Sequence, residues 1–262
     1  MEKPRVIFYH DELNDEFSTA VIKARKIDGN YNYGTSSALW KLAHFFIYRV
    51  LAIPCAWLYL KIVWRHKIVN KSVMKPFLRG SFFLYGNHTS TTFDPLVPAF
   101  VSFPRAAFVI VHPANVSIPF VGRLLPFAGA LPLPDTFGAT KNFMGTMKLR
   151  VSELSSVAIY PEAHIWPYCT KIRNFSEASF SYPVRFGTPV FSFTNTYQKS
   201  RFSKRPRIVT YVDGPFFPDE TLGRKLAVKK LRDEVHAKMT ERSLMSDVEI
   251  IKYVRAGASE EN

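Results

Sequence analysis

Six short apolar runs constrain the fold of this 262-residue chain more than any other feature of its sequence. They span residues 82–85, 107–111, 130–133, 157–160, 190–194 and 208–212. Short apolar runs between turn residues are typical of buried strands, and stretches of helical periodicity such as 136–154 and 221–244 lie between some of them. Because strands that alternate with helices build α/β domains, we predict a mixed, largely parallel sheet flanked by helices.

The chain is long enough to bury one full core, so we expect one main domain with appendages. Residues 1–35 are predicted to be an N-terminal extension with a surface strand and a short helix. Residues 36–80 are predicted to be an amphipathic helical region, and residues 81–250 the α/β domain. The polar end of the chain, residues 251–262, is predicted to be a disordered tail.

The most apolar part of the chain is residues 36–65, which favours association with a membrane. Its uncharged run from Val50 to Leu60 carries Pro54 and is about half the roughly 20 apolar residues that a spanning helix needs. We therefore predict a hairpin of two amphipathic helices lying in the membrane interface, a monotopic rather than a spanning arrangement. An ordinary buried helical hairpin is the alternative.

The net charge of +14, from 35 basic and 21 acidic residues, indicates an anionic partner. Long apolar runs interrupt the basic residues and no nucleic-acid-binding motif is present, so we expect an anionic membrane surface and no nucleic acid. The two cysteines, Cys55 and Cys169, form no C-x-x-C motif and indicate a reduced chain. Together these features predict a location at the cytoplasmic face of a membrane.

Polar residues follow the first of the predicted strands, where Asn87 and His88 leave the run 82–85. Asp94 follows shortly afterwards and is the only acidic residue between Asp28 and Asp135. A carboxylate can hold one imidazole nitrogen so that the other takes a proton from an alcohol. We therefore predict that His88 is a general base and that Asp94 orients it.

A second polar strand end follows the run 157–160, where Pro161 and Glu162 leave the strand. Because the carboxyl ends of parallel strands meet at one edge of a sheet, Glu162 and His88 are expected to share a pocket. Lys171 and Arg173 form a basic pair placed to bind a phosphate. A solvated loop is the alternative for each of these three charged residues.

These motifs together resemble the glycerolipid acyltransferases, which include lysophosphatidic acid acyltransferases and tafazzin-like enzymes. The family signatures are N-H-x4-D, a glycine-rich segment ending near an Arg, F-P-E-G, and a V-P-hydrophobic strand. The matches, which span residues 36–215, are Asn87-His88…Asp94, Tyr160-Pro161-Glu162-Ala163 and Gly187-Thr188-Pro189-Val190-Phe191.

The chain departs from the family pattern at three places. Phe93 stands where the family usually has its Asp, so that the motif here is H-x5-D, and we predict that Asp94 caps the next helix with its side chain turned back to His88. Ala163 replaces the glycine of F-P-E-G, which predicts that the backbone there does not need a strongly positive φ. The glycine-rich segment ends at Asp135 rather than near an Arg.

The resemblance implies an O-acyltransferase of phospholipid biosynthesis, with residues 81–250 as the acyltransferase domain. In that scheme His88 deprotonates the free hydroxyl of a lysophospholipid, with 1-acylglycerol-3-phosphate the favoured acceptor and phosphatidic acid the product. The acyl donor is acyl-CoA or an acyl-carrier protein, with no further cofactor. Asn87 is assigned to substrate binding, with backbone N–H groups after it as donors to the oxyanion. Glu162 binds the glycerol hydroxyl or orders the pocket.

Two other functions stay open at this point. His88, Asp94, Glu162 and His164 resemble a metal-binding set of two His with a carboxylate. We predict no metal site, because only Glu162 and His164 have the close spacing that is usual for ligands. A basic, non-catalytic membrane-binding protein is the other alternative. Serine-hydrolase and phosphate-loop chemistry are disfavoured, because G-x-S-x-G and G-x4-G-K-[ST] are absent.

Overall fold

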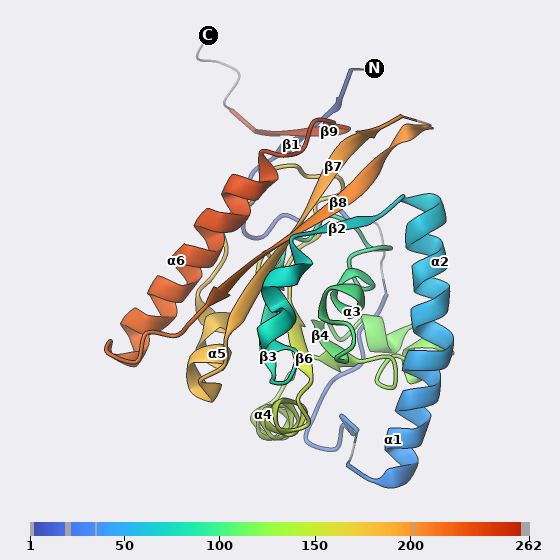
Figure 1. Cartoon of the computed structure of the whole chain (residues 1–262), viewed down its shortest axis with the longest axis vertical. Helices are drawn as coiled ribbons and strands as arrows, with labels where there is room; N and C mark the ends of the chain where they lie inside the picture. Colours follow the sequence, from blue (N-terminus) through green and yellow to red (C-terminus); the bar gives the residue numbers. More distant parts are fainter. Residues whose placement is uncertain (1–2, 19–21, 35, 202, 258–262) are drawn as a thin grey trace.

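A seven-stranded sheet forms the centre of the molecule in the computed structural model, which describes residues 3–18, 22–34, 36–201 and 203–257 (Figure 1). The strand order is β2-β8-β7-β3-β6-β4-β5, and all neighbours are parallel except the β7–β8 pair. The predicted mixed, largely parallel sheet is therefore confirmed. The strands are β2 (Lys67–Val69), β3 (Phe82–Gly86), β4 (Ala107–Val111), β5 (Ala130–Pro132), β6 (Ser156–Ile159), β7 (Val190–Ser200) and β8 (Ser203–Phe216).

Both faces of the sheet are covered, as an apolar central strand requires. On β3, Phe83 and Tyr85 pack into one apolar cluster with helices α4 and α6, whereas Phe82 and Leu84 pack into a second cluster on the opposite face. This alternation follows from the two-residue repeat of a strand. The helices of the domain are α3 (Val97–Ser102), α4 (Phe137–Ser152), α5 (Ser181–Phe186) and α6 (Arg224–Ser243), with short 3-10 turns η2 (Lys71–Phe77), η3 (Asn115–Ser117), η4 (Val121–Arg123) and η5 (Ala178–Phe180).

One continuous helix of 26 residues precedes the sheet, built from α1 (Ala38–His44), a π-helical segment η1 (Phe45–Ala52) and α2 (Ile53–Val63). The predicted hairpin of two helices is therefore wrong. Pro54 lies in the first turn of α2, directly after the π-helical segment, where the amide of Ile53 bonds the carbonyl of Tyr48. The wider π turn accommodates the proline without a reversal of the chain.

The long helix runs along one side of the molecule (Figure 1), and few of its residues are buried. It is long and apolar enough to cross a membrane by length and composition, and only 11% of its most apolar window is buried. Such an exposed apolar helix can associate with a membrane. The residues that it buries are Trp40, Tyr48, Ala56 and Leu60, and its large exposed apolar residues are Leu39, Leu42, Phe45, Phe46, Val50, Leu51, Trp57, Leu58 and Ile62.

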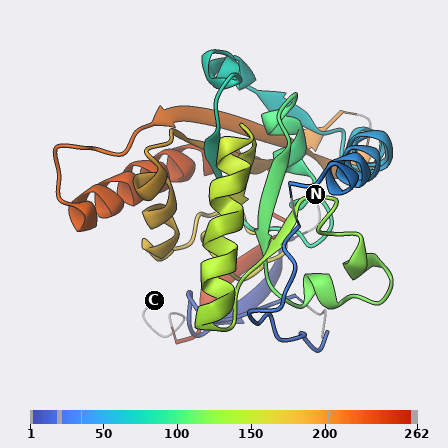
Figure 2. The ribbon, with the colours of Figure 1, turned by 90° about the horizontal axis from the view of Figure 1, so that it is seen from below.

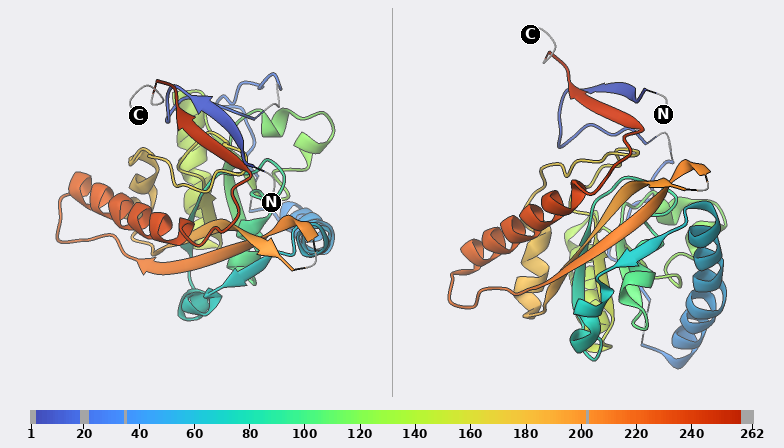
Figure 3. Two further views of the ribbon diagram at one scale, coloured as in Figure 1. Left: turned by 90° about the horizontal axis from the view of Figure 1, so that it is seen from above. Right: turned by 45° about the horizontal axis from the view of Figure 1, so that its top comes forward.

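The two ends of the chain meet in a separate two-stranded parallel sheet, β1 (Arg5–Tyr9) with β9 (Ile251–Arg255) (Figure 3). The prediction of a disordered tail is therefore wrong for residues 251–255, while residues 258–262 lie outside the described part of the chain. The strand expected in the N-terminal extension is present, but its described residues contain no helix. Tyr9, Phe17 and Tyr253 all pack their rings against Trp166, which ties the small sheet to the loop after β6.

Candidate active site

The candidate site lies where β3 ends, between its parallel neighbours β6 and β7. Gly86, the last residue of β3, passes so close to β7 that a Cβ there would lie 2.2 Å from the Phe193 ring. The chain then turns through His88 to Asp94 and continues into α3. Residues that leave β3 and β6 therefore meet at one edge of the sheet, as predicted.

His88 and Asp94 form the predicted pair, with Nδ1 of the imidazole 2.9 Å from Oδ2 of the carboxylate. Oδ2 also accepts the backbone N–H groups of Thr89, at 2.6 Å, and Ser90, at 2.8 Å. The Asp94 side chain is 0% exposed, while that of His88 is 17% exposed. The buried carboxylate holds Nδ1, so that Nε2 is the imidazole nitrogen left for a substrate.

The extra residue of the H-x5-D motif is absorbed by the protein core. Phe93 is fully buried, with its ring 5.1 Å from that of Trp64, and this lets the turn curl so that Asp94 points back at His88. The predicted direction of the Asp94 side chain is confirmed. The predicted helix cap is wrong, because Leu96 is the N-cap of α3 and Asp94 accepts from amides that precede it.

The electrostatics of Asp94 reflect two opposed effects. Burial raises the pKa of its carboxyl group, and the hydrogen bonds from His88 and from the amides of Ser90 and Thr89 oppose that rise. The aromatic ring of Tyr160 stacks on the imidazole with 4.5 Å between the ring centroids, and its hydroxyl donates to the Asp94 carbonyl. The imidazole is thus held both at its edge and across its face.

A buried polar chain continues from Asp94 through the sheet. Asn195 in β7 donates from Nδ2 to Oδ1 of Asp94 at 3.2 Å, and its own Oδ1 accepts the Thr210 hydroxyl of β8 at 2.6 Å. Nε2 of His66, just before β2, lies 2.8 Å from the same hydroxyl oxygen. Since the Thr210 proton goes to Asn195, His66 must donate to Thr210. Desolvation by burial, with a smaller effect of Lys61, lowers the pKa of His66 to about 4.

Sequence reasoning missed Asn195, Thr210 and His66. The available signal was the placement of polar residues inside apolar stretches, as in Phe193-Thr194-Asn195-Thr196. A polar side chain in the interior of a buried strand needs a hydrogen-bond partner, so it points to a network. The pattern of residues does not say which partner that is.

Asn87 does not contact the space around His88 in the way that the substrate-binding prediction requires. Its side chain donates to the carbonyl of Asn195 at 3.0 Å and accepts the Asn195 amide at 2.8 Å. The residue is 1% exposed, and both polar groups of its amide are used. Asn87 therefore extends the pairing of β3 with β7 beyond Gly86 and fixes the strand end that carries His88.

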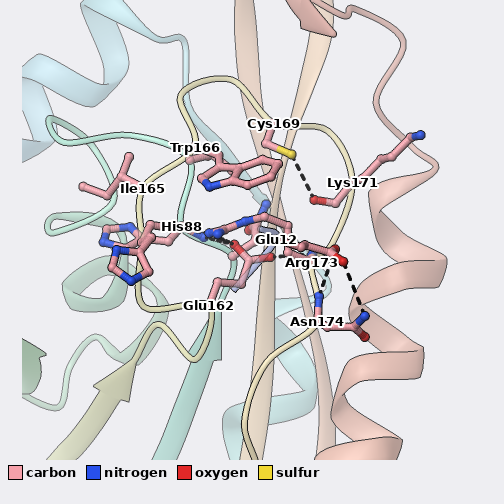
Figure 4. A network of polar contacts seen from close by, with 12 residues as sticks. Glu12, His88, Glu162, Ile165, Trp166, Cys169, Lys171, Arg173 and Asn174 are labelled. Carbon is pink, nitrogen blue, oxygen red and sulfur yellow. Dashed lines mark hydrogen bonds and ion pairs between the residues drawn. The ribbon is translucent and has the colours of Figure 1, made fainter. Parts of the chain in front are cut away.

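Glu162 joins three parts of the site in a buried clamp (Figure 4). Its Oε2 accepts the backbone N–H of His88 at 3.0 Å and Nη2 of Arg173 at 3.1 Å, and its Oε1 accepts the Arg173 amide at 3.0 Å. Glu162 and Arg173 are 4% and 2% exposed. Of the two roles considered for Glu162, this geometry supports ordering of the pocket rather than contact with a glycerol hydroxyl.

The predicted phosphate-binding pair of Lys171 and Arg173 is not formed. The Arg173 guanidinium is neutralised by Glu162, donates to the His164 carbonyl and packs over the Trp166 ring at 4.7 Å. Lys171 is exposed, and Figure 4 shows its side chain directed away from Glu162. Neighbouring positions of an irregular loop point to different surroundings, so sequence proximity did not make them a pair.

The loop after β6 is also bound to the His88 turn through the backbone. The amide of Trp166 donates to the His88 carbonyl at 3.2 Å, and that of Tyr168 to the Thr89 carbonyl at 3.0 Å. Ala163 in this loop has a φ of 62°, in the left-handed region, so the prediction that this position does not need a strongly positive φ is wrong. The hydrogen bonds of the neighbouring residues hold Ala163 in a conformation that glycine adopts more easily.

The proposed backbone donors to an oxyanion are also engaged within the protein. The amide of His88 donates to Glu162, and the amides of Thr89 and Ser90 donate to Asp94. A tetrahedral oxyanion would need other donors, so this prediction is wrong for these three amides. These three amides instead bind the carboxylates of Glu162 and Asp94.

The described part of the chain contains no cluster of ligands that would support the alternative of a metal centre. His164 pairs with the N-terminal extension, with its Nδ1 3.2 Å from a carboxylate oxygen of Glu16. Glu162 faces the His88 backbone rather than its imidazole. Among the residues that the structure describes, no three His, Cys, Asp or Glu side chains lie close enough together to hold a metal ion.

Of three comparisons with known proteins, the comparison with solved structures gives a match. No protein-family model matches the chain, and no curated protein matches it. Among solved structures, it is similar to the crystal structure of the 1-acyl-sn-glycerophosphate (LPA) acyltransferase PlsC from Thermotoga maritima, at 15% identity and a TM-score of 0.46. The similarity covers 78% of this chain and 95% of that chain. At this identity and TM-score, the activity of the chain has to be argued from its own site.

Proposed function

We propose that this protein is an O-acyltransferase that moves a fatty acyl group from an acyl thioester to the free hydroxyl of a lysophospholipid. The observation that carries the proposal is the 2.9 Å contact of His88 Nδ1 with the fully buried Asp94, which leaves Nε2 as the basic nitrogen. The order of the Asn87-His88…Asp94 and Pro161-Glu162 motifs supports the same chemistry. We infer 1-acylglycerol-3-phosphate as the acceptor and phosphatidic acid as the product.

The reaction needs no covalent intermediate on the protein. His88 Nε2 takes the proton of the acceptor hydroxyl while the oxygen attacks the thioester carbonyl carbon. Asp94 stabilises the imidazolium that forms and keeps the ring in the correct tautomer. When the tetrahedral intermediate collapses, the carbon–sulfur bond breaks, and the imidazolium returns the proton to the thiolate. The products are the ester and a free thiol.

The substrates and the location follow from charge and from the exposed helix. A phosphorylated acceptor, a donor on coenzyme A or an acyl-carrier protein, and an anionic bilayer are all negatively charged, which suits a net charge of +14. The apolar helix Ala38–Val63 supports work at a membrane surface. The two free cysteines suit the reducing, cytoplasmic face.

A non-catalytic membrane-binding role explains the exposed helix equally well, but it does not explain why Asp94 is buried beside His88. Burying a carboxylate with 0% exposure costs free energy unless it is compensated by several donors. Adhesion to a bilayer needs no such group. The cost is understandable if Asp94 orients His88 for proton transfer.

A screen of acyl donors and lysophospholipid acceptors, on membranes that contain the protein, tests the proposal. We expect transfer by the wild type and its loss in His88→Ala. The matched control is His112→Ala, because His112 is exposed and lies outside the site. Acyl transfer that survives intact in His88→Ala would refute the mechanism.

A further inference from the structure

A strained turn presents a phenylalanine to solvent at the edge of the domain. Phe120 is 90% exposed and has φ and ψ angles of 61° and −58°. The amide of Val121 bonds the Pro119 carbonyl at 2.6 Å, which closes a γ-turn around Phe120. A γ-turn with positive φ is rare and strained, and a bulky residue there is an outlier. The side chain of Phe120 contributes almost no buried area within the protein, so packing does not explain the strained backbone. The strain therefore indicates that Phe120 contacts another molecule or a membrane.

The surrounding loop holds this turn firmly. The amide of Gly122 donates to the Ile118 carbonyl at 2.8 Å, and that of Leu124 to the Val121 carbonyl at 2.9 Å. A Cβ at Gly122 would lie 2.5 Å from the Val116 carbonyl oxygen, so the close approach requires glycine. Val121 and Leu124 are 50% and 52% exposed. The loop is therefore a rigid support for three exposed apolar side chains.

Basic residues surround this apolar tip. Lys23, Arg25 and Arg123 line a hollow of about 540 Å³ beside Phe120. Among the described residues, no acidic side chain lines that hollow. Exposed apolar side chains with basic residues beside them suit the interface of an anionic bilayer, where the lipid phosphates lie above the acyl chains.

The chain just after this loop contacts the exposed apolar helix. Nδ1 of His44 in α1 is 2.7 Å from the carbonyl oxygen of Phe127, and the Trp40 ring stacks near the Phe127 ring. Figure 2 and the left view of Figure 3 show the loop and the helix projecting on the same side of the molecule, beyond the central sheet. A flat surface on that side of the molecule touches both elements.

We propose that the loop Ile118–Leu124 is a second membrane contact, with Phe120, Val121 and Leu124 in the acyl boundary of an anionic bilayer. Lys23, Arg25 and Arg123 then meet lipid phosphates. A helix that lies on a bilayer leaves the protein free to roll about the helix axis. A contact away from that axis stops the rolling and fixes how the domain faces the lipid. This inference does not depend on acyl transfer.

Vesicle co-sedimentation of the full chain tests the contact. Phosphatidylcholine vesicles, with and without phosphatidylglycerol, are titrated with the wild type, Phe120→Ser and Phe137→Ser. Phe137 is the matched control because it is 91% exposed but begins α4, which Figure 2 shows apart from the loop. We expect Phe120→Ser to weaken binding about tenfold and Phe137→Ser to leave it unchanged. Arg123→Gln should reduce the preference for the anionic vesicles.

A second measurement reports insertion directly. Phe120→Trp and Phe137→Trp are bound to vesicles that contain brominated lipids, and their fluorescence is compared with that of the wild type and its four native tryptophans. We expect additional quenching only in Phe120→Trp. Equal binding by the wild type and Phe120→Ser, an equal loss in both serine variants, or no additional quenching in Phe120→Trp would each overturn the proposal.

Discussion

Asn195 donates a hydrogen bond from its side-chain Nδ2 to Oδ1 of Asp94, at 3.2 Å, from the strand next to β3. The bond occupies the carboxylate oxygen that does not face His88. Thr210, the direct register partner of Asn195, donates to the other end of the same amide and so fixes which way it points. The orientation of Asp94 is thus set from β7 and β8 as well as from its own turn.

Replacement of Asn195 by Ala should lower kcat about tenfold to hundredfold, with KM little changed. A hydrogen bond to a charged group contributes about 1.5–3 kcal/mol. Asp94 stabilises the positive charge of His88 mainly in the transition state, when the imidazole is protonated, so loss of this bond should lower kcat. Steady-state kinetics of the purified variant would measure the effect. Asn174→Ala is the matched control, because Asn174 is exposed and bonds Glu12.

Two replacements of Thr210 distinguish the effect of its hydroxyl group from the effect of its shape. Thr210→Ser keeps the donor to Asn195 Oδ1 and should retain near-normal kcat, whereas the isosteric Thr210→Val should lose severalfold. Kinetics and thermal unfolding should be measured on both variants. Equal kcat in the two would show that the hydroxyl does not orient the amide.

Replacement of Asp94 by Asn should lower kcat by about 10³–10⁴-fold while the fold is retained. The amide cannot stabilise an imidazolium, and it permits the wrong tautomer of His88. Circular dichroism should be recorded beside the kinetics, and Asp247→Asn is a control at an exposed carboxyl. Near-normal activity would mean that a group other than Asp94 orients His88.

Stability should depend on pH through His66. Burial depresses its folded-state pKa to about 4, below the ordinary value of 6.5, so the unfolded chain binds the proton more readily. Stability from this group is therefore complete above pH 6.5 and falls as the pH drops towards 4, by about 3 kcal/mol in total. Urea unfolding at neutral pH and near pH 4.5 should show a smaller loss in His66→Gln than in the wild type. Parallel losses would contradict this, and His112→Gln serves as the exposed control.

Removal of the Glu162 charge should destabilise the fold strongly. Glu162→Gln leaves the guanidinium of Arg173, which is 2% exposed, without its counter-ion, a change that typically costs about 3–5 kcal/mol. The double variant Glu162→Gln/Arg173→Met should recover part of that loss. Asp219→Asn, which breaks an exposed pair with Lys230, should change stability little. Denaturant unfolding of the four proteins would test the clamp.

The reactivity of the two cysteines should report where the helix lies. Cys55 is exposed on α2, so a membrane-impermeant maleimide should label it in detergent solution but not in vesicles if the helix is covered by lipid. Cys169 is a built-in control, because burial raises the pKa of its thiol to about 12 and keeps it unreactive. Equal labelling of Cys55 in both conditions would place this part of the helix in water.

The pattern of apolar residues was enough to predict the α/β class and the closing helix, and the polar residues after the first strand predicted the pairing of His88 with Asp94. Those features depend on local periodicity, or on two residues only six positions apart that leave the same strand. The continuity of the helix Ala38–Val63 was harder to predict, because a proline in an apolar run is compatible with a break in the helix and with a π turn. Its hydropathy was evident, but its continuity was not.

Only the tertiary structure decided what surrounds the pair. Asp94 follows β3, Asn195 and Thr210 lie in β7 and β8, and His66 precedes β2. These strands are neighbours in the sheet, but the β7–β8 pair lies about 100 residues along the chain from Asp94 and about 140 from His66. Likewise, only packing made Arg173 the partner of Glu162 while Lys171 faces solvent. The sequence determined which residues form strands and which polar groups leave them. The partners of those groups depend on strand order, which results from long-range packing rather than from local periodicity.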